Sequence, residues 1–248
     1  MIIAYYTIHY GSDYLGWSIK SVYDFVDKIY ILYTSTPSQG FSTNLGNPDT
    51  REKLVASAYL FGDPKNKIQW IEGQWPNEGA HRAAIKNVSS QDCPDMILAV
   101  DSDEIWYPDV LENSIKEARD SKVDTCVIRM LTLWRSFSWS CTDEMQPIRI
   151  TLPKMPQGTY KLQTSSNGRV LHFGYARDLA SIRYKMTVQG HRAEWRPEWY
   201  SRYENWPLSG NNDFHPVVEN VWNAIPFDKS KMPAFMREHP YYNLEVIS

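Results

Sequence analysis

Two aspartates stand two positions apart, directly after a run of apolar residues. The run, Met96-Ile97-Leu98-Ala99-Val100, predicts a buried strand, and Asp101 comes at its carboxyl end. Asp103 lies two residues on, so both carboxylates face the same side if the chain stays extended. Such oxygen ligands suit Mg²⁺ or Mn²⁺, which bind few carboxylates and complete their shell with phosphate oxygens and water. Asp101-Ser102-Asp103 therefore predicts a cation site where the metal neutralises charge on a leaving diphosphate.

The same residues also have a purely structural interpretation. Asp101 would then cap the turn that follows the strand, while Asp103 and Glu104 would be solvated. The choice between the two interpretations depends on the elements around the pair.

Strands and helices alternate through the first half of the chain. Strands are predicted at 2–8, 28–33, 68–71, 96–100 and 125–131, and helices at 13–26, 51–60, 78–88 and 108–121. We expect Asp13 to cap the first helix and Pro108 to open the last one. This alternation is typical of a parallel α/β sheet with helices on both faces, which binds ligands at the carboxyl ends of its strands.

The second half of the chain loses this alternation. It has short strands near 147–152 and 168–173, a helix near 176–187, and an aromatic stretch from Trp195 to Trp206. The change near residue 131 predicts two subdomains, 1–131 and 132–248, within one compact domain.

Charge and cysteine content exclude several classes of protein. The chain has 248 residues and a formal net charge of −3, which leaves no electrostatic footprint for general nucleic-acid binding. No apolar run approaches the roughly 20 residues that span a membrane, and the first residues read as a strand, not as a signal peptide. The 3 cysteines are too few and too widely spaced for a disulfide framework. We therefore expect a cytoplasmic protein with free thiols.

The order of segments resembles that of glycosyltransferases with a GT-A fold, in particular the family-2-like group with a DxD motif. Four segments carry the resemblance, over roughly residues 2–135: Ile2-Ile3-Ala4-Tyr5-Tyr6-Thr7-Ile8, Asp27-Lys28-Ile29-Tyr30-Ile31-Leu32-Tyr33, Gly79-Ala80-His81-Arg82-Ala83-Ala84-Ile85, and Asp95-Met96-Ile97-Leu98-Ala99-Val100-Asp101-Ser102-Asp103-Glu104. The chain departs from the family's pattern at Tyr33-Thr34-Ser35-Thr36, where many relatives have Asp-Gly-Ser/Thr, and at Ala83, where Asn is usual.

The resemblance implies a Rossmann-like, mixed and mostly parallel sheet flanked by helices. It makes 1–131 the donor-binding subdomain and 132–248 an aromatic-rich acceptor-binding subdomain with a C-terminal extension. Uridine is the nucleobase expected from the family. The residues that it places around the donor are Tyr6, Thr7 and Ile8 at the nucleobase, Arg82 at the ribose or diphosphate, and Asp101, Ser102 and Asp103 at the metal and diphosphate.

A histidine in the second half resembles the third metal ligand of several GT-A enzymes. His172 follows a short apolar stretch, and Gly174 would leave room for a phosphate to approach. Lys185 follows at a spacing suited to a diphosphate contact. His191 is the competing ligand, and a role for His172 as a satisfied core histidine stays open.

Aromatic residues make up 14% of the chain, with 10 Trp, and aromatic faces stack on sugars or bases. We expect Trp195, Trp199 and Trp206 to form an acceptor platform; a packed aromatic cover over the sheet is the alternative. An inverting enzyme also needs a carboxylate that deprotonates the acceptor hydroxyl. The candidates for this base are Glu194, Glu198 and Asp213.

These features predict a metal-dependent glycosyltransferase that moves a sugar from a nucleotide-diphosphate sugar to a hydroxyl acceptor. The acceptor is a saccharide, a protein side chain or a hydroxylated base in modified DNA. A phosphatase or phosphotransferase would place the Asp-x-Asp pair after the first strand, and a nucleotidyltransferase would want a Gly-rich basic loop after that strand. A non-catalytic carbohydrate-binding protein would use the aromatic residues alone.

Overall fold

The computed structural model describes residues 1–37, 41, 43–142, 145–163, 169–190 and 192–248. The chain divides into two compact units, and we describe each by itself. The first unit comprises Met1–Gly40, Asp49–Arg129 and Gln146–Val170, and the second comprises Phe41–Pro48, Met130–Met145 and Leu171–Ser248. The units therefore interleave along the chain, and the donor and acceptor roles of 1–131 and 132–248 stay predictions.

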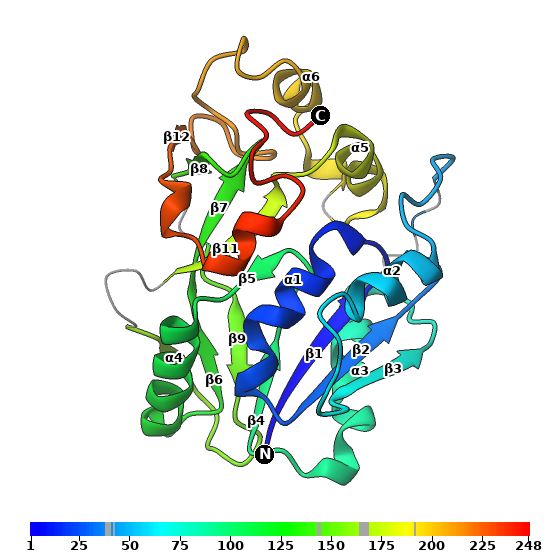
Figure 1. The fold of residues 1–248 in the computed structure, drawn as a ribbon, viewed down its shortest axis with the longest axis vertical. Helices are drawn as coiled ribbons and strands as arrows, with labels where there is room; N and C mark the ends of the chain where they lie inside the picture. Colours follow the sequence, from blue (N-terminus) through cyan, green and yellow to red (C-terminus); the bar gives the residue numbers. More distant parts are fainter. Residues whose placement is uncertain (38–40, 42, 143–144, 164–168, 191) are drawn as a thin grey trace. The chain divides into compact units, whose positions relative to one another are not determined.

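The described residues of the first unit form a seven-stranded sheet (Figure 1). Its strand order is β10-β6-β9-β4-β1-β2-β3. The bounds are β1 Ile2–Ile8, β2 Lys28–Tyr33, β3 Ile68–Glu72, β4 Met96–Ala99, β6 Thr125–Val127, β9 Ile148–Thr151 and β10 Thr159–Lys161. β9 runs antiparallel to β4 and β6, while β1, β2, β3 and β4 are parallel. The expected α/β fold with a mixed, mostly parallel sheet is confirmed.

Helices cover both faces of this sheet. Successive residues of a strand point to opposite sides, so the apolar residues of the strands need a helix on each face. The helices are α1 Ser12–Val22, α2 Arg51–Ala58, α3 Glu78–Val88 and α4 Pro108–Ser121. Ile85 of α3 packs against Ile3 and Tyr5 of β1 on one face. On the other face, the Ser18 hydroxyl of α1 donates a hydrogen bond to the Tyr6 hydroxyl at 3.3 Å. α1 in turn packs against α2 and α4.

The start of α1 differs from the prediction that Asp13 caps it. The cap residue is Gly11, whose φ of 123° lies in a region that side chains rarely adopt. The first N–H groups of a helix have no partner within the helix. Here Asp49, a residue distant in sequence, accepts hydrogen bonds from the backbone N–H groups of Gly11 at 2.7 Å and Ser12 at 2.8 Å. The cap comes from a residue 37 positions further along the chain, which local sequence cannot reveal. Pro108 does open α4, as expected.

α1 and α2 approach closely at Gly16. A Cβ atom at this position would lie 2.4 Å from the Ser57 carbonyl oxygen and 2.9 Å from the Leu60 Cβ. Gly16 is therefore required by packing.

The second unit contains a smaller sheet around an aromatic core. Strands β7, β8, β11 and β12 have the order β12-β8-β7-β11, and α5 and α6 follow β11 in the chain. The bounds are β7 Arg129–Trp134, β8 Trp139–Cys141, β11 Arg169–Tyr175, α5 Leu179–Val188, α6 Trp199–Glu204 and β12 Ala224–Pro226. The remaining short elements are β5 Glu104–Ile105 and the 3₁₀ turns η1 Tyr23–Phe25, η2 Ser90–Asp92, η3 Arg192–Glu194, η4 Lys229–Lys231 and η5 Ala234–Glu238.

The single strand expected at 125–131 is two strands. β6 pairs with β9 and β10, whereas β7 belongs to the other sheet. Ile128 lies between them and donates its N–H to the Pro147 carbonyl at 3.1 Å. The β-prone residues continue from the first strand into the second, so the sequence does not show where the chain passes from one sheet to the other.

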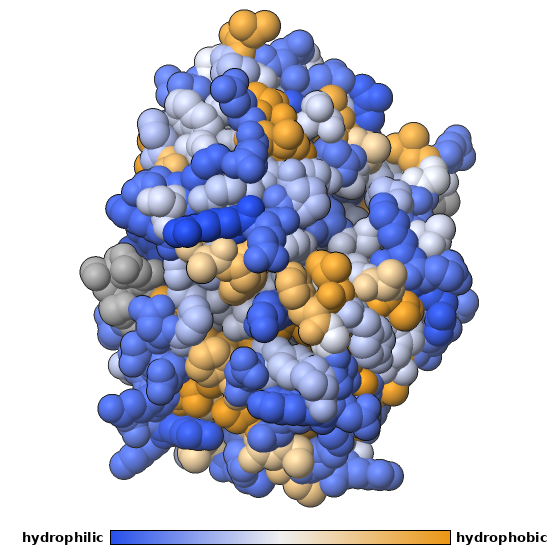
Figure 2. Space-filling model, in the orientation of Figure 1, coloured by the Kyte–Doolittle hydropathy of each residue, from blue (hydrophilic) through white to orange (hydrophobic). Residues whose placement is uncertain are grey.

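On the face drawn in Figure 2, the described residues form no continuous apolar surface that would mark a site. Figure 2 shows hydrophilic residues over most of the face viewed, with apolar residues in small groups between them. Scattered apolar residues of this kind are normal for a folded protein. Among the described residues, no helix has the length and apolar character needed to cross a membrane.

Candidate functional site

Asp101 is held just beyond the carboxyl end of β4. The Val100 N–H donates to the Tyr5 carbonyl at 3.0 Å, which extends the pairing of β4 with β1 by one residue. The Ser18 hydroxyl donates to the Asp101 carbonyl at 3.2 Å. The backbone of Asp101 is therefore fixed by β1 and α1 at the sheet edge where ligands of α/β proteins bind.

Two arginines hold the Asp101 carboxylate, one at each oxygen. Arg82 Nη2 lies 3.0 Å from Oδ1, and Arg149 Nη2 lies 2.7 Å from Oδ2. Arg82 comes from α3 and Arg149 from β9, the strand that pairs with β4. The structure thus brings Arg82 to Asp101, and it adds Arg149, which sequence reasoning missed. The available signal was a lone cation inside the short apolar strand Ile148-Arg149-Ile150.

Arg149 also binds Glu104, whose side chain is fully buried. Arg149 Nε lies 2.9 Å from Glu104 Oε1 and 3.1 Å from Oε2. Burial raises the pKa of Glu104 to about 8, against the lowering effect of the Arg149 charge. The interpretation in which Asp103 and Glu104 are solvated is wrong, because Asp103 is only 8% exposed and Glu104 is completely enclosed.

The three residues expected at the nucleobase lie on opposite faces of β1. Tyr6 and Ile8 point into the core and are 0% and 1% exposed. Thr7, between them, is partly exposed. Alternation along β1 explains the division, so of these three residues only Thr7 offers its side chain to a ligand. Ser102, two residues before the start of β5, is buried.

An aromatic pair lies beside Arg82. The Trp75 indole stacks on the His81 imidazole with centroids 4.2 Å apart and planes 11° apart. His81 Nε2 lies 2.8 Å from the Leu32 carbonyl oxygen, at the end of β2. Burial lowers the pKa of His81 to about 4, so the ring is neutral at pH 7. The half-buried Trp75 was not singled out from the sequence, because Trp75 stands outside every predicted strand and helix.

Two carboxylates of the kind that Asp101 and Asp103 carry are a donor set that suits a divalent cation which keeps part of its own shell. Mg²⁺ is usually bound through one or two carboxylates, with substrate phosphates and waters completing the octahedron. Within the described part of the chain, no group of three or more His, Cys, Asp or Glu side chains is arranged to hold a metal by itself. The full set of Asp101, Asp103 and His172 therefore stays a prediction.

His172 lies in β11 of the second unit. Its Nδ1 is 3.2 Å from the Thr132 hydroxyl, and its Nε2 would be 2.5 Å from a Cβ atom at Gly174. The space over Gly174 that was expected to admit a phosphate therefore holds the His172 ring. Lys185 Nζ donates to the Gly174 carbonyl at 3.2 Å and lies 4.7 Å from the Tyr175 ring centroid. The competing His191 lies outside the described residues.

The candidate bases differ in how they are held. Asp213 accepts hydrogen bonds from Arg196 and Arg202, each at 2.8 Å. Burial raises its pKa, but these bonds and one from the Asn220 N–H outweigh burial and leave the pKa below its ordinary value. A carboxylate clamped in this way is a weak base. Glu194 and Glu198 are exposed, and their role as base stays a prediction.

The three tryptophans belong mainly to the core of the second unit. Trp199 is 1% exposed and its indole N–H donates to the Phe214 carbonyl at 2.7 Å. Trp206 is 4% exposed, and Trp195 packs edge-on against Trp199 at 4.6 Å. Trp199 and Trp206 are thus the packed cover that was the alternative to an acceptor platform.

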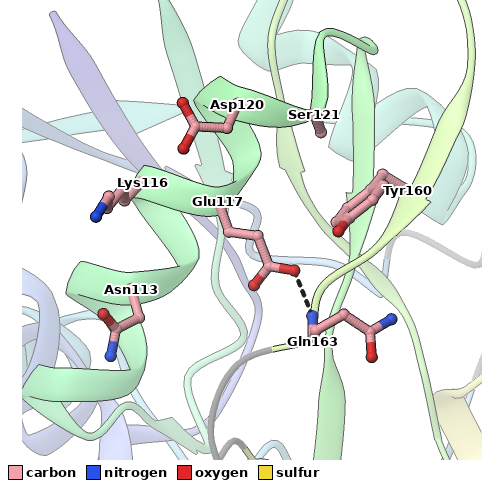
Figure 3. A pocket seen from close by; sticks show the side chains of 7 residues that line it. All are labelled: Asn113, Lys116, Glu117, Asp120, Ser121, Tyr160 and Gln163. Atoms are coloured by element: carbon pink, nitrogen blue, oxygen red, sulfur yellow. Dashed lines mark hydrogen bonds between the residues drawn. The ribbon is translucent and has the colours of Figure 1, made fainter.

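A surface hollow of about 610 Å³ lies elsewhere in the first unit (Figure 3). Its lining residues are Asn113, Lys116, Glu117, Asp120, Ser121, Tyr160 and Gln163. The Gln163 N–H donates to the Glu117 carboxylate at 2.6 Å, which ties β10's end to α4. None of the predicted site residues lines this hollow.

Comparison with known proteins gives distant structural similarities. No family model and no curated protein matches the sequence. One similar structure is TarS of S. aureus, with a TM-score of 0.35 and 14% identity over 53% of this chain and 22% of TarS. Another is a "putative nucleotide-diphospho-sugar transferase" from Desulfovibrio desulfuricans G20, with a TM-score of 0.36 and 14% identity over 61% of this chain and 63% of that one. This chain spans less than two thirds of either protein, and at these scores neither match assigns an activity.

Proposed function

We propose that the chain is a glycosyltransferase that moves a sugar from a nucleotide-diphosphate sugar to a hydroxyl acceptor, with Mn²⁺ or Mg²⁺ at Asp101 and Asp103. The observation that supports this most is the charge arrangement after β4. The Asp101 carboxylate and the partly exposed Arg82 form an ion pair just beyond the carboxyl end of β4 in a mostly parallel sheet, and Asp103 follows two residues on. Acidic and cationic groups together suit a ligand made of a cation and a diphosphate.

Each residue has a separate task in this proposal. A bound divalent cation would neutralise the charge that develops on the leaving diphosphate. Asp101 and Asp103 would hold the cation, and Arg82 would bind a phosphate oxygen. Arg149 would keep the Asp101 carboxylate in position. The nucleobase, uracil by resemblance, would lie near Thr7 and Trp75.

The acceptor is a hydroxyl group of a saccharide, of a protein side chain or of a hydroxylated base in modified DNA. The candidate bases for its deprotonation are Glu194 and Glu198, which are exposed. Asp213 is the weaker candidate because two arginines hold it.

A screen of nucleotide sugars by thermal shift, with and without Mn²⁺, tests this function. A bound donor stabilises the fold by about 2.7 kcal/mol at a hundredfold excess over its Kd. We expect one nucleotide sugar to raise the Tm in the presence of Mn²⁺, and slow hydrolysis of that donor to release its nucleoside diphosphate. Transfer of the nucleoside monophosphate with release of a sugar phosphate would instead indicate a nucleotidyltransferase, and sugar binding without turnover would indicate a carbohydrate-binding protein.

A further inference from the structure

The two arginines on Asp101 differ in their freedom to leave it. The Arg149 side chain is 8% exposed, and its second partner, Glu104, is fully buried. The Arg82 side chain is 31% exposed, and its further partners are Glu78, which is 50% exposed and one turn earlier on α3, and the neutral Tyr5 side chain. Removing Arg149 would leave a buried carboxyl group unpaired, whereas Arg82 can move without this penalty.

We infer that Arg82 is an exchangeable counterion, which covers Asp101 in the unliganded protein and passes to the diphosphate when a divalent cation takes its place. This inference rests on the proposed function and adds a coupling between its two ligands. Each ligand removes an obstacle for the other: the cation releases Arg82, and the diphosphate gives Arg82 a new partner. By linkage, the factor by which one ligand tightens the other is the same in both directions.

The geometry supports a reorientation of Arg82 and not its removal. Arg82 Nε lies 2.9 Å from Glu78 Oε1, so Glu78 can retain the base of the guanidinium while Nη2 leaves Asp101. Arg149 meanwhile keeps Asp101 Oδ2 in place at 2.7 Å, which leaves the carboxylate oriented for the cation. Because Arg149 stays on Oδ2, a cation at Asp101 would bind Oδ1 and so need the place that Arg82 Nη2 holds, 3.0 Å from that oxygen.

This inference is tested by binding Mn²⁺ to the protein without nucleotide, followed by electron paramagnetic resonance of free Mn²⁺. We expect Arg82→Met to tighten Mn²⁺ binding about tenfold or more, because it removes the competing charge from Asp101. The same variant should weaken UDP binding in the presence of Mn²⁺, measured by calorimetry. The measurement of Mn²⁺ binding without nucleotide decides the question, because UDP itself chelates Mn²⁺ and would change the concentration of free Mn²⁺.

Three further variants keep the result specific. Arg82→Lys retains the charge and should restore weak Mn²⁺ binding, and Asp101→Asn combined with Arg82→Met should abolish the gain. Arg51→Met removes an exposed arginine that pairs with Glu72 and should change neither affinity.

The outcomes separate this inference from the function on which it rests. If Arg82→Met weakens UDP binding and leaves Mn²⁺ binding unchanged or weaker, Arg82 is a phosphate ligand alone and the exchange is overturned, while the proposed function stands. If the wild-type protein binds neither Mn²⁺ nor UDP, separately or together, the proposed function fails, and the exchange fails with it.

Discussion

The Trp75 indole lies parallel to the His81 imidazole, with centroids 4.2 Å apart. Trp75 comes from the loop before α3 and His81 from its first turn, one residue before Arg82. Because His81 Nε2 faces the Leu32 carbonyl, this nitrogen carries the proton and the neutral ring has Nδ1 as its acceptor. The pair therefore fixes the start of α3, the helix that carries Arg82.

Acid should weaken the fold through His81. Its pKa in the folded protein is lowered to about 4 from 6.5, so the unfolded chain takes up the proton first as pH falls. The contribution of neutral His81 to the free energy of unfolding is complete above pH 6.5 and is lost as pH falls towards 4. The pKa difference of this residue corresponds to about 3 kcal/mol. His81→Gln keeps a donor to Leu32 but does not titrate. Urea unfolding at pH 7 and pH 4 should show a steeper loss in the wild type, and parallel losses would contradict this role.

Asp103→Asn should remove activity and spare the fold. The substitution keeps the size of the side chain and removes the charge that the proposed cation needs. We expect donor turnover and Mn²⁺-dependent donor binding to fall at least a hundredfold, with a Tm close to that of the wild type. Turnover assays and thermal unfolding measure the two effects, and full activity in this variant would remove Asp103 from the metal site.

The pair of Arg149 and Glu104 should show strong coupling. Arg149→Ala leaves the buried Glu104 without its partner and should lower the free energy of unfolding by about 3–5 kcal/mol. Replacing both residues, as Arg149→Met with Glu104→Leu, should cost less than Arg149→Ala because no buried carboxyl group remains. Lys154→Ala, which breaks the exposed pair with Asp95, is the control and should cost about 0–1 kcal/mol. Additive effects in urea unfolding would show that the two residues act independently.

Gly16→Ala should separate α1 from α2. The added Cβ would meet the Ser57 carbonyl oxygen at 2.4 Å, and a backbone atom cannot turn aside as a side chain can. We expect a loss of about 1–3 kcal/mol in the free energy of unfolding. Gly46→Ala is the matched control, since a Cβ there has no neighbour within 4 Å in the described structure. Equal stability of the two variants would show that the helices can move apart freely.

The fold of the first unit was largely predictable because its patterns are local. The apolar run of Met96 to Val100 and the start of α4 at Pro108 both appear where the sequence indicates them. The cap of α1 was not predictable, because Asp49 reaches it from a distant loop. Long-range contacts of this kind leave no periodic trace in a sequence.

The candidate site was predictable only in its exposed part. The resemblance assigned Arg82 to the ribose or diphosphate and Asp101 to the metal of the same donor, and in the structure the two side chains form an ion pair. The role of Arg149 depends on β9 lying beside β4, a neighbour relation that strand patterns do not encode. Trp199 illustrates the opposite error: an aromatic stretch with cations suggests a ligand surface, but only packing shows that the ring is enclosed.

The place of β9 in the sheet has a consequence for biosynthesis. β4 ends at Ala99, yet the strand that pairs with its free edge begins at Ile148. During translation, β1 to β4 can associate long before β9 leaves the ribosome, and the edge of β4 stays open for that interval. Asp101 and Glu104 receive Arg149 only when β9 arrives. A nascent chain arrested before residue 148 would therefore present an unpaired strand edge, which is a favourable surface for chaperones and for aggregation.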